Sequence, residues 1–367
     1  MAPPTPKSKQ SKKKKAKKED ERFAEVKKPP TPQGRKVTTR ETAPATPEKK
    51  AEEPEKGQAK PPPTDSARDL LKLIIDLGVS GLRAKWVELK PYAGPNKAIT
   101  AFTANPDKNR YKDTVCLDET RVKITPEEAN EGDYIHANWV KMDKRETWIA
   151  TQAPTEATIV DFWRMCWEHE VVNIVQLCRL VEDGKIKCAA YWPDEPGLFQ
   201  NHGRFFVNNK KKEKQEGFTA LTIELLPDGC SNSRIVRLIQ MHDWPDRGVP
   251  TTGPHLLRFL RALDKHGDEL NKGQTVMHCS AGIGRTGTIM LIHWMKTACA
   301  ANESFDPFEM FKKLRDQRAS SVQTEQQFLF VFATCMDWLE SRYSQLPSKF
   351  GQVQKALLDY NNNNNNN

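Results

Sequence analysis

The chain divides near residue 65 into a segment that cannot build a hydrophobic core and a segment that can. Residues 1–65 hold 12 of the 25 prolines and a single aromatic side chain, Phe23. They carry 18 lysines and arginines against 10 aspartates and glutamates, and so +8 of the formal net charge of +9. So little apolar surface cannot offset the chain entropy lost on folding. We therefore expect residues 1–65 to be a disordered basic tail and the fold to lie beyond them.

The rest of the chain is nearly neutral, with 39 basic and 38 acidic side chains. The excess positive charge thus belongs to the tail and does not indicate a fold specific for nucleic acid. No run approaches the roughly 20 apolar residues of a membrane-spanning helix, and the lysine-rich N-terminus lacks the apolar stretch of a secretion signal. We expect a cytoplasmic protein without a transmembrane segment. The lysine cluster would contact anionic surfaces or bind import factors that carry the protein to the nucleus.

The cysteines are scattered and show neither a C-x-x-C pair nor the Cys/His spacing of a zinc site. This pattern favours a reducing compartment, with no disulfide framework and no structural metal. We also expect no cofactor. The eight cysteines are Cys116, Cys166, Cys178, Cys188, Cys230, Cys279, Cys299 and Cys335.

Apolar periodicity predicts alternating helices and strands over residues 66–345. A first helix is expected to start at Asp65–Ser66 and to stop at Gly78. Residues 203–217 are expected to form an exposed hairpin turn, and 346–367 a low-complexity C-terminal tail. Together the elements indicate one α/β domain with a mixed sheet flanked by helices on both faces. Strands are expected at 134–140, 148–152, 171–177, 218–225, 234–241 and 275–278; further helices at 155–169 and after Pro254, Arg285, Pro307 and Thr324.

Residues 276–287 carry the clearest chemical signal, because a short strand delivers Cys279 to a glycine-rich turn that opens a helix. Gly282 and Gly284 allow backbone N–H groups to converge, and the helix N-terminus adds positive potential. Arg285 offers a planar fork for two phosphate oxygens. Such a field favours a nucleophilic thiolate at Cys279, to which the hydroxyl of Thr286 can donate. The predicted phosphate cradle comprises Ser280, Ala281, Gly282, Ile283, Gly284 and Arg285.

The segment from His278 to Gly287 resembles the phosphate-binding loop of the non-receptor protein tyrosine phosphatases. Residues 244–250, Trp-Pro-Asp-Arg-Gly-Val-Pro, resemble the mobile acid loop of that family, and 108–113 its phosphotyrosine-recognition loop. Segments 148–154, 161–165, 187–193 and 323–328 fall in the family's order. The resemblance covers residues 66–345 and implies a highly twisted mixed sheet, the cysteine-dependent phosphatase fold, and hydrolysis of phosphotyrosine in proteins.

The resemblance also implies roles for individual side chains. Asp246 would protonate the leaving tyrosyl oxygen and then activate water, with Trp244 as the hinge of its loop. Tyr111 would stack on the substrate ring and Asp113 would accept hydrogen bonds from the peptide backbone. The remaining implied residues are Gln323 and Gln327, which orient water, Glu182, which braces Arg285, Lys187, which braces the acid loop, and His278, which supports Cys279.

Several positions depart from the family pattern. His136 stands where asparagine is usual, and Ala153 where glycine is usual. Ser320 lies near the expected pocket rim, and Arg247, beside the acid, occupies a variable position; both bear on substrate range. Two other hypotheses remain open: a catalytically inactive phosphotyrosine-binding module, and a protein whose main function resides in its basic tail.

Overall fold

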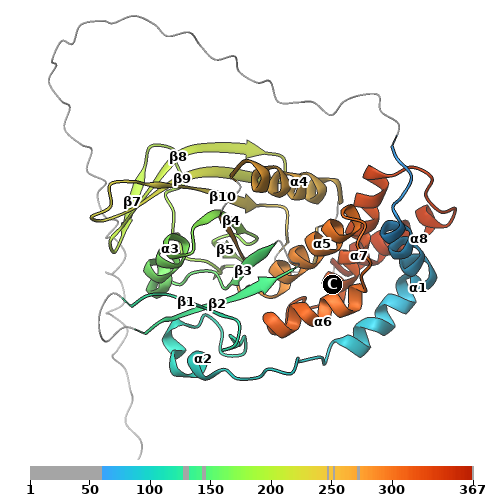
Figure 1. Cartoon of the computed structure of the whole chain (residues 1–367), viewed down its shortest axis with the longest axis horizontal. Coiled ribbons are helices and arrows are strands. Elements are labelled where there is room, and N and C mark those ends of the chain that lie inside the picture. Colours follow the sequence, from blue (N-terminus) through green and yellow to red (C-terminus); the bar gives the residue numbers. More distant parts are fainter. Residues whose placement is uncertain are drawn as a thin grey trace, which may run out of the picture. The chain divides into compact units, whose positions relative to one another are not determined.

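A nine-stranded mixed sheet organises the described part of the chain, and its four central strands are parallel (Figure 1). The structure is a computed structural model that describes residues 60–126, 132–142, 146–245, 248–250, 253–270 and 273–365. The strand order is β1-β2-β3-β11-β4-β10-β9-β8-β7, with β3, β11, β4 and β10 parallel and the outer pairs antiparallel. β5 and β6 form a separate hairpin. The strands are β1 (Arg121–Lys123), β2 (Tyr134–Lys141), β3 (Thr147–Thr151), β4 (Val171–Gln176), β5 (Val181–Glu182), β6 (Lys185–Ile186), β7 (Phe199–His202), β8 (Phe205–Gln215), β9 (Phe218–Pro227), β10 (Arg234–Met241) and β11 (Gln274–His278).

Helices flank both faces of the sheet, as expected for an α/β domain (Figure 1). α3 packs against β2 and β4, whereas α5 packs against β11 and α6 against β2. Among the described residues, no helix has both the length and the apolar character needed to cross a bilayer. The helices are α1 (Asp65–Leu89), α2 (Thr100–Ala104), η1 (Pro106–Lys108), η2 (Glu156–Thr158), α3 (Ile159–Glu168), α4 (Gly253–Leu270), α5 (Gly284–Ala300), α6 (Pro307–Gln317), α7 (Glu325–Arg342) and α8 (Phe350–Asn365).

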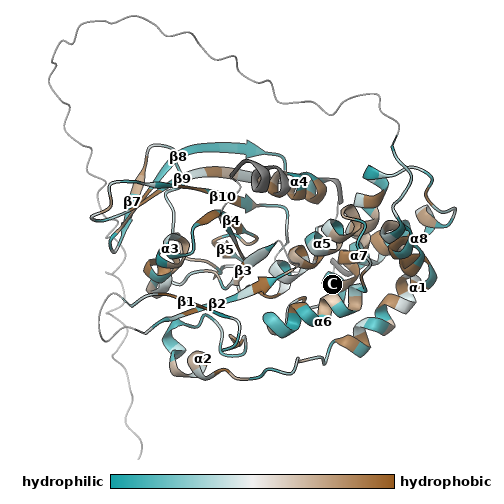
Figure 2. Cartoon of the chain, viewed as in Figure 1, coloured by the Kyte–Doolittle hydropathy of each residue, from teal (hydrophilic) through white to brown (hydrophobic). Residues whose placement is uncertain are grey.

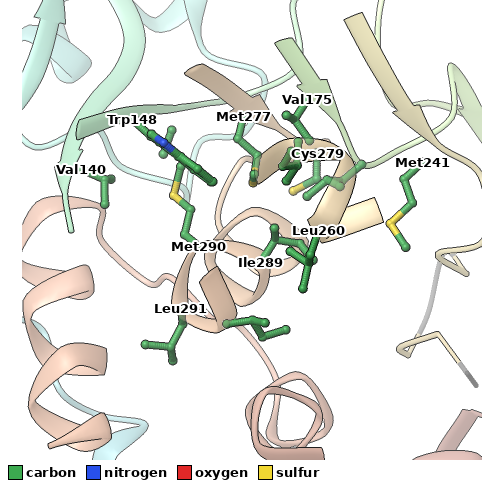
Figure 3. Close-up of a cluster of buried hydrophobic side chains, with 14 of the residues drawn as sticks. Val140, Trp148, Val175, Met241, Leu260, Met277, Cys279, Ile289, Met290 and Leu291 are labelled. Atoms are coloured by element: carbon green, nitrogen blue, oxygen red, sulfur yellow. The ribbon is translucent and has the colours of Figure 1, made fainter. Parts of the chain in front are cut away.

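The central strands are apolar because both of their faces are covered. Ile174 and Val175 of β4 and Val276 and Met277 of β11 are fully buried. Figure 2 shows hydrophobic residues near β4, whereas the long outer strand β8 is largely hydrophilic. Cys279 adjoins this core, next to Val175 and Met277 (Figure 3). The nucleophile predicted from the sequence therefore lies against the buried core of the sheet.

The expected hairpin turn at 203–217 is wrong, because most of this segment is the strand β8. The turns lie at its two ends, where Gly203 and Gly217 adopt φ of 57° and 86°. Phe205 and Val207 alternate with more exposed residues, which is the period of a half-buried strand. The lysine-rich second half remains paired with β9, where Lys210 forms an ion pair with Glu224 at 3.3 Å.

The first helix extends beyond the predicted stop. Its N-cap is Thr64, whose hydroxyl accepts from the Ala67 N–H at 3.3 Å. Gly78 has φ of 55°, so the helix breaks there, but it resumes at once and continues to Leu89. Leu82 is fully buried after the kink. Burial of this second apolar stripe explains why Gly78 kinks the helix without ending it.

The expected C-terminal tail is also wrong over most of its length, because residues 350–365 form α8. This helix packs against α1 and α7, and Leu357 is fully buried there. The Gln326 side-chain amide of α7 donates to the Asn361 carbonyl at 2.8 Å. An apolar stripe ahead of the asparagine run therefore docks the segment onto the domain.

Candidate active site

Four loops meet at one edge of the sheet, because the carboxyl ends of parallel strands point the same way. β3 is followed by Gln152, β4 by the loop to Glu182, β11 by Cys279 and β10 by the loop with Trp244. Positions more than 120 residues apart are thus brought around one cysteine. The topology, rather than any local pattern, assembles the site.

Residues 279–284 form a tight cradle between β11 and α5. The Gly282 N–H donates to the Cys279 sulfur at 3.2 Å, and the thiol side chain is only 5% exposed. Gly282 has φ of 70°, and a Cβ at this position would lie 1.9 Å from the Thr151 carbonyl oxygen. Only glycine satisfies both constraints. The loop therefore turns the Gly282 amide toward the sulfur while its back packs closely against β3.

Arg285, in the first turn of α5, is locked by a two-pronged ion pair with Glu182. Its Nη1 and Nη2 donate to the two carboxylate oxygens at 2.7 and 3.0 Å, and Nη1 also donates to the Leu177 carbonyl at 2.8 Å. Burial lowers the pKa of Arg285, but Glu182 and the nearby Cys279 raise it more, so the net pKa lies above its ordinary value. The guanidinium is a permanent, oriented cation beside the thiol.

Tyr111 forms one wall of the site. Its hydroxyl donates to the Ser280 hydroxyl at 2.8 Å, and the Ser280 hydroxyl donates to the Lys187 carbonyl at 3.1 Å. The loop that carries Tyr111 is held in place by its neighbour Arg110, whose Nε donates to the Ala153 carbonyl at 3.0 Å. The tyrosine ring is therefore fixed against the cradle.

A cavity of about 300 Å³ opens above the cysteine. On its far side the Gln323 N–H donates to Gln327 Oε1 at 2.9 Å, at the start of α7. Every lining residue except Thr114 was predicted from the sequence as a site residue. The lining residues are Tyr111, Asp113, Thr114, Glu182, Lys187, Cys279, Ser280, Ala281, Gly284, Arg285, Gln323 and Gln327.

Two predicted residues lie beneath the cradle. His278 is fully buried, and burial lowers its pKa to about 4. Its neutral ring donates through Nδ1 to the Cys279 carbonyl at 3.1 Å and accepts at Nε2 from the Tyr191 hydroxyl at 2.8 Å. Thr286 is also buried, but its hydroxyl has no hydrogen-bond partner among the described residues. Its bond to the Cys279 sulfur therefore stays a prediction.

Comparison with known proteins agrees with this geometry. A family model described as protein-tyrosine phosphatase matches residues 105–337. The chain belongs to the protein-tyrosine phosphatase family. This confirms the family resemblance predicted from the sequence.

Individual relatives of this phosphatase domain match over similar lengths. Receptor-type tyrosine-protein phosphatase zeta of Rattus norvegicus is 36% identical over 265 residues, which are 68% of this chain and 11% of that protein. Tyrosine-protein phosphatase non-receptor type 9 of Mus musculus is 35% identical over 258 residues, 66% of this chain and 43% of that protein. Tyrosine-protein phosphatase 1 of Caenorhabditis elegans is 34% identical over 285 residues, 74% and 27% respectively. The chain thus spans less than half the length of these relatives.

The predicted acid loop of the phosphatase is only partly visible. Asp246 and Arg247 lie outside the described residues. Trp244, the expected hinge residue, is buried, and its indole N–H donates to the Gly248 carbonyl at 3.1 Å, which lies beyond these two positions in the sequence. Trp244 also packs edge-on against Phe330 of α7. The two ends of the loop are therefore anchored to the domain.

One further residue contacts the cradle from below and was not predicted from the sequence as a site residue. Arg318 is fully buried after α6, and its Nε and Nη2 donate to the carbonyls of Gly282 and Ala281 at 3.1 and 3.0 Å. Nothing in the local sequence distinguishes it from the exposed arginines of a helix end. Only the packing of α6 beneath the loop reveals it.

Proposed function

We propose that this phosphatase domain hydrolyses phosphotyrosine in proteins through a cysteinyl-phosphate intermediate and without a cofactor. The observation that carries the proposal is the convergence of a buried thiol, a fixed guanidinium and a tyrosine wall on one cavity. The cradle suits a phosphoryl group, because its amides and Arg285 match the charge on the equatorial oxygens. The Tyr111 wall suits an aromatic ester, whereas a phosphoserine side chain is too short to bring its phosphorus to Cys279.

In the first step, the Cys279 sulfur attacks phosphorus in line with the tyrosyl oxygen. The S–P bond forms as the P–O bond breaks, and Asp246 donates a proton to the departing tyrosyl oxygen. Arg285 binds the equatorial oxygens throughout, which the ion pair with Glu182 allows without further ordering. Asp113 accepts hydrogen bonds from the substrate backbone and sets the depth of entry.

In the second step, water attacks phosphorus and the S–P bond breaks. Asp246, now a carboxylate, takes the proton from water, as microscopic reversibility requires. Gln323 and Gln327 orient that water, and inorganic phosphate leaves. Two observations support this role: Gln323 and Gln327 both line the cavity, and the Gln323 backbone N–H donates to the Gln327 side-chain oxygen.

Phosphate release from a phosphotyrosyl peptide tests the proposal. Cys279→Ser should abolish turnover and still bind the peptide, and Asp246→Ala should slow turnover by orders of magnitude and trap substrate. Cys230→Ser, at a half-exposed cysteine remote from the cavity lining, is the matched control and should keep wild-type turnover. Full activity in Cys279→Ser would overturn the mechanism. A wild-type protein that binds the peptide without hydrolysing it would favour the inactive binding module.

We also propose that the basic segment addresses the enzyme, in the cytoplasm, to anionic surfaces or to nuclear import factors. The distribution of charge supports this, because +8 of the formal net charge of +9 is concentrated in these 65 residues. Deleting residues 1–56 should leave hydrolysis of a small phosphotyrosyl peptide unchanged. Loss of nuclear accumulation of a tagged protein would favour import factors, and loss of cosedimentation with anionic vesicles would favour membranes. Loss of hydrolysis would contradict an addressing role.

A further inference from the structure

We propose that His136 is a positioning residue that couples the phosphotyrosine-recognition loop to the phosphate cradle through Arg318. The inference rests on the proposed function, since it concerns how the same cradle is held in shape. His136 lies on β2 and does not line the cavity. Its effect on the reaction is therefore indirect.

The first link joins Arg318 to the cradle. Its guanidinium draws the carbonyls of Ala281 and Gly282 away from the cavity. Because each peptide unit is planar, a carbonyl pulled outward turns the N–H of the following residue inward. Arg318 therefore fixes the direction of the amides that face the phosphate.

The second link joins Arg318 to His136. Both Nη atoms lie 3.3 Å from His136 Nδ1, and Nη1 also donates to Asn138 Oδ1 at 2.7 Å. Since a guanidinium can only donate, Nδ1 must be the unprotonated, accepting nitrogen. Among the described residues no carboxylate bonds to Arg318, so its charge is compensated by neutral acceptors alone. That charge remains available to an anion in the cradle.

The third link joins His136 to the recognition loop. With Nδ1 unprotonated, Nε2 carries the hydrogen and donates to the Thr114 carbonyl at 2.8 Å. Thr114 follows Asp113 directly, and Tyr111 of the same loop bonds to Ser280. The loop is thus tied to the cradle at two points. Burial lowers the pKa of His136 to about 3, which keeps the ring neutral and able to accept and donate at once.

The experiment compares His136→Phe, His136→Asn and His293→Phe, each in the full chain. Orthovanadate binding by calorimetry reports the cradle without requiring turnover, and phosphotyrosyl-peptide kinetics report kcat and KM separately. His136→Phe removes both hydrogen bonds, and we expect vanadate affinity to fall about tenfold and the peptide KM to rise about tenfold. His136→Asn keeps one acceptor and one donor, and should restore both values to within about threefold.

His293 is the matched control, because it is also buried and bonded, to Glu146 at 2.8 Å, but lies outside the cavity lining. His293→Phe should lower stability and leave vanadate affinity unchanged. A His136→Phe protein that binds vanadate within twofold of wild type would overturn the inference, as would an asparagine variant no better than the phenylalanine one. Should no peptide hydrolysis occur in wild type, the vanadate measurement still decides the inference.

Nitrogen NMR of the wild-type protein provides a test that needs no variant to fold. The His136 ring should show an unprotonated Nδ1 and a protonated Nε2 from pH 5 to 8, and its resonances should shift when vanadate binds. A ring that titrates in this range, or that carries its hydrogen on Nδ1, would overturn the inference.

Discussion

At the scale of single residues, the cradle leaves little freedom for substitution. Gly282 combines a left-handed backbone with contact against the Thr151 carbonyl, and Glu182 is the buried counter-ion of Arg285. Each side chain, or its absence, sets the position of a group that we propose binds the phosphate. Substitutions here should therefore separate loss of function from ordinary loss of stability.

Gly282→Ala should disable the cradle. The left-handed φ costs about 1–2 kcal/mol for a residue with a Cβ, and overlap with the Thr151 carbonyl adds to it by pushing the loop off β3. We expect kcat/KM for a phosphotyrosyl peptide to fall at least 100-fold and thermal stability to drop. Gly229→Ala is the control, because Gly229 has φ of 79° with nothing within 4 Å of a Cβ. Equal losses in both variants would show that backbone strain alone is responsible.

Glu182→Gln should weaken phosphate binding. The variant keeps the shape of the side chain but removes the charge that holds the buried Arg285 guanidinium, which leaves a buried charge without its partner. We expect kcat/KM to fall by at least about tenfold, measured by steady-state kinetics with the same peptide. Glu195→Gln removes a carboxylate from the exposed pair with Lys212 and should change nothing measurable. An active Glu182→Gln enzyme would argue against Arg285 as the phosphate ligand.

At the scale of elements, short connections place the groups of the site. The β5–β6 hairpin turns through Asp183 and Gly184, whose φ values of 47° and 69° are those of a two-residue primed turn. Glu182 is the last residue of β5, directly before this turn. The tight turn therefore fixes the place from which Glu182 reaches Arg285. The docking of α8 is a second local event, with Leu357 as its buried anchor.

Leu357→Ala should undock α8 in part. Removing a fully buried leucine side chain costs about 2–5 kcal/mol, and here the loss falls on the interface with α1 and α7. We expect a lower denaturation midpoint in urea and faster amide exchange within residues 350–360. Lys355→Ala, at an exposed position of the same helix, should leave both measurements unchanged. Unchanged stability of Leu357→Ala would indicate that 346–367 behaves as the tail expected from the sequence.

At the scale of the whole molecule, buried histidines make stability depend on pH. Burial lowers the pKa of His278 to about 4 and that of His136 to about 3, whereas both protonate near 6.5 when unfolded. Between pH 6.5 and 4 the unfolded chain therefore binds more protons, so acidification destabilises the fold. Burial also lowers the pKa of His202 and His242, which act in the same sense, whereas Asp337, whose pKa burial raises to about 6, acts in the opposite sense.

Urea unfolding at pH 7 and pH 5 measures this dependence. The free energy of unfolding should be lower at pH 5, with a slope of up to about 1.4 kcal/mol per pH unit for each of the two histidines. His136→Asn removes one of them and should show a shallower decline. Stability that rises from pH 7 to pH 5 would contradict the burial of both rings in neutral form.

Much of the fold could be predicted because it depends on local patterns. The six strands expected from apolar runs all formed, with boundaries within two residues, and so did the helices after Pro307 and Thr324. β8 was missed because a lysine-rich run reads as a loop until its pairing with β9 is known. α8 was missed because its apolar stripe is short and is followed by asparagines.

The sequence by itself determined the cradle. The cysteine, the two glycines and the arginine lie close together in the sequence, so the strand, the turn and the start of the helix could be predicted from a local pattern. Tertiary structure decided what surrounds it. Arg318 and His136 are charged or titratable side chains whose burial depends on α6 and β2 meeting beneath the loop, and no local pattern records that meeting. Long-range packing, unlike a turn, cannot be predicted from a local sequence pattern, because it joins residues that are distant in the sequence.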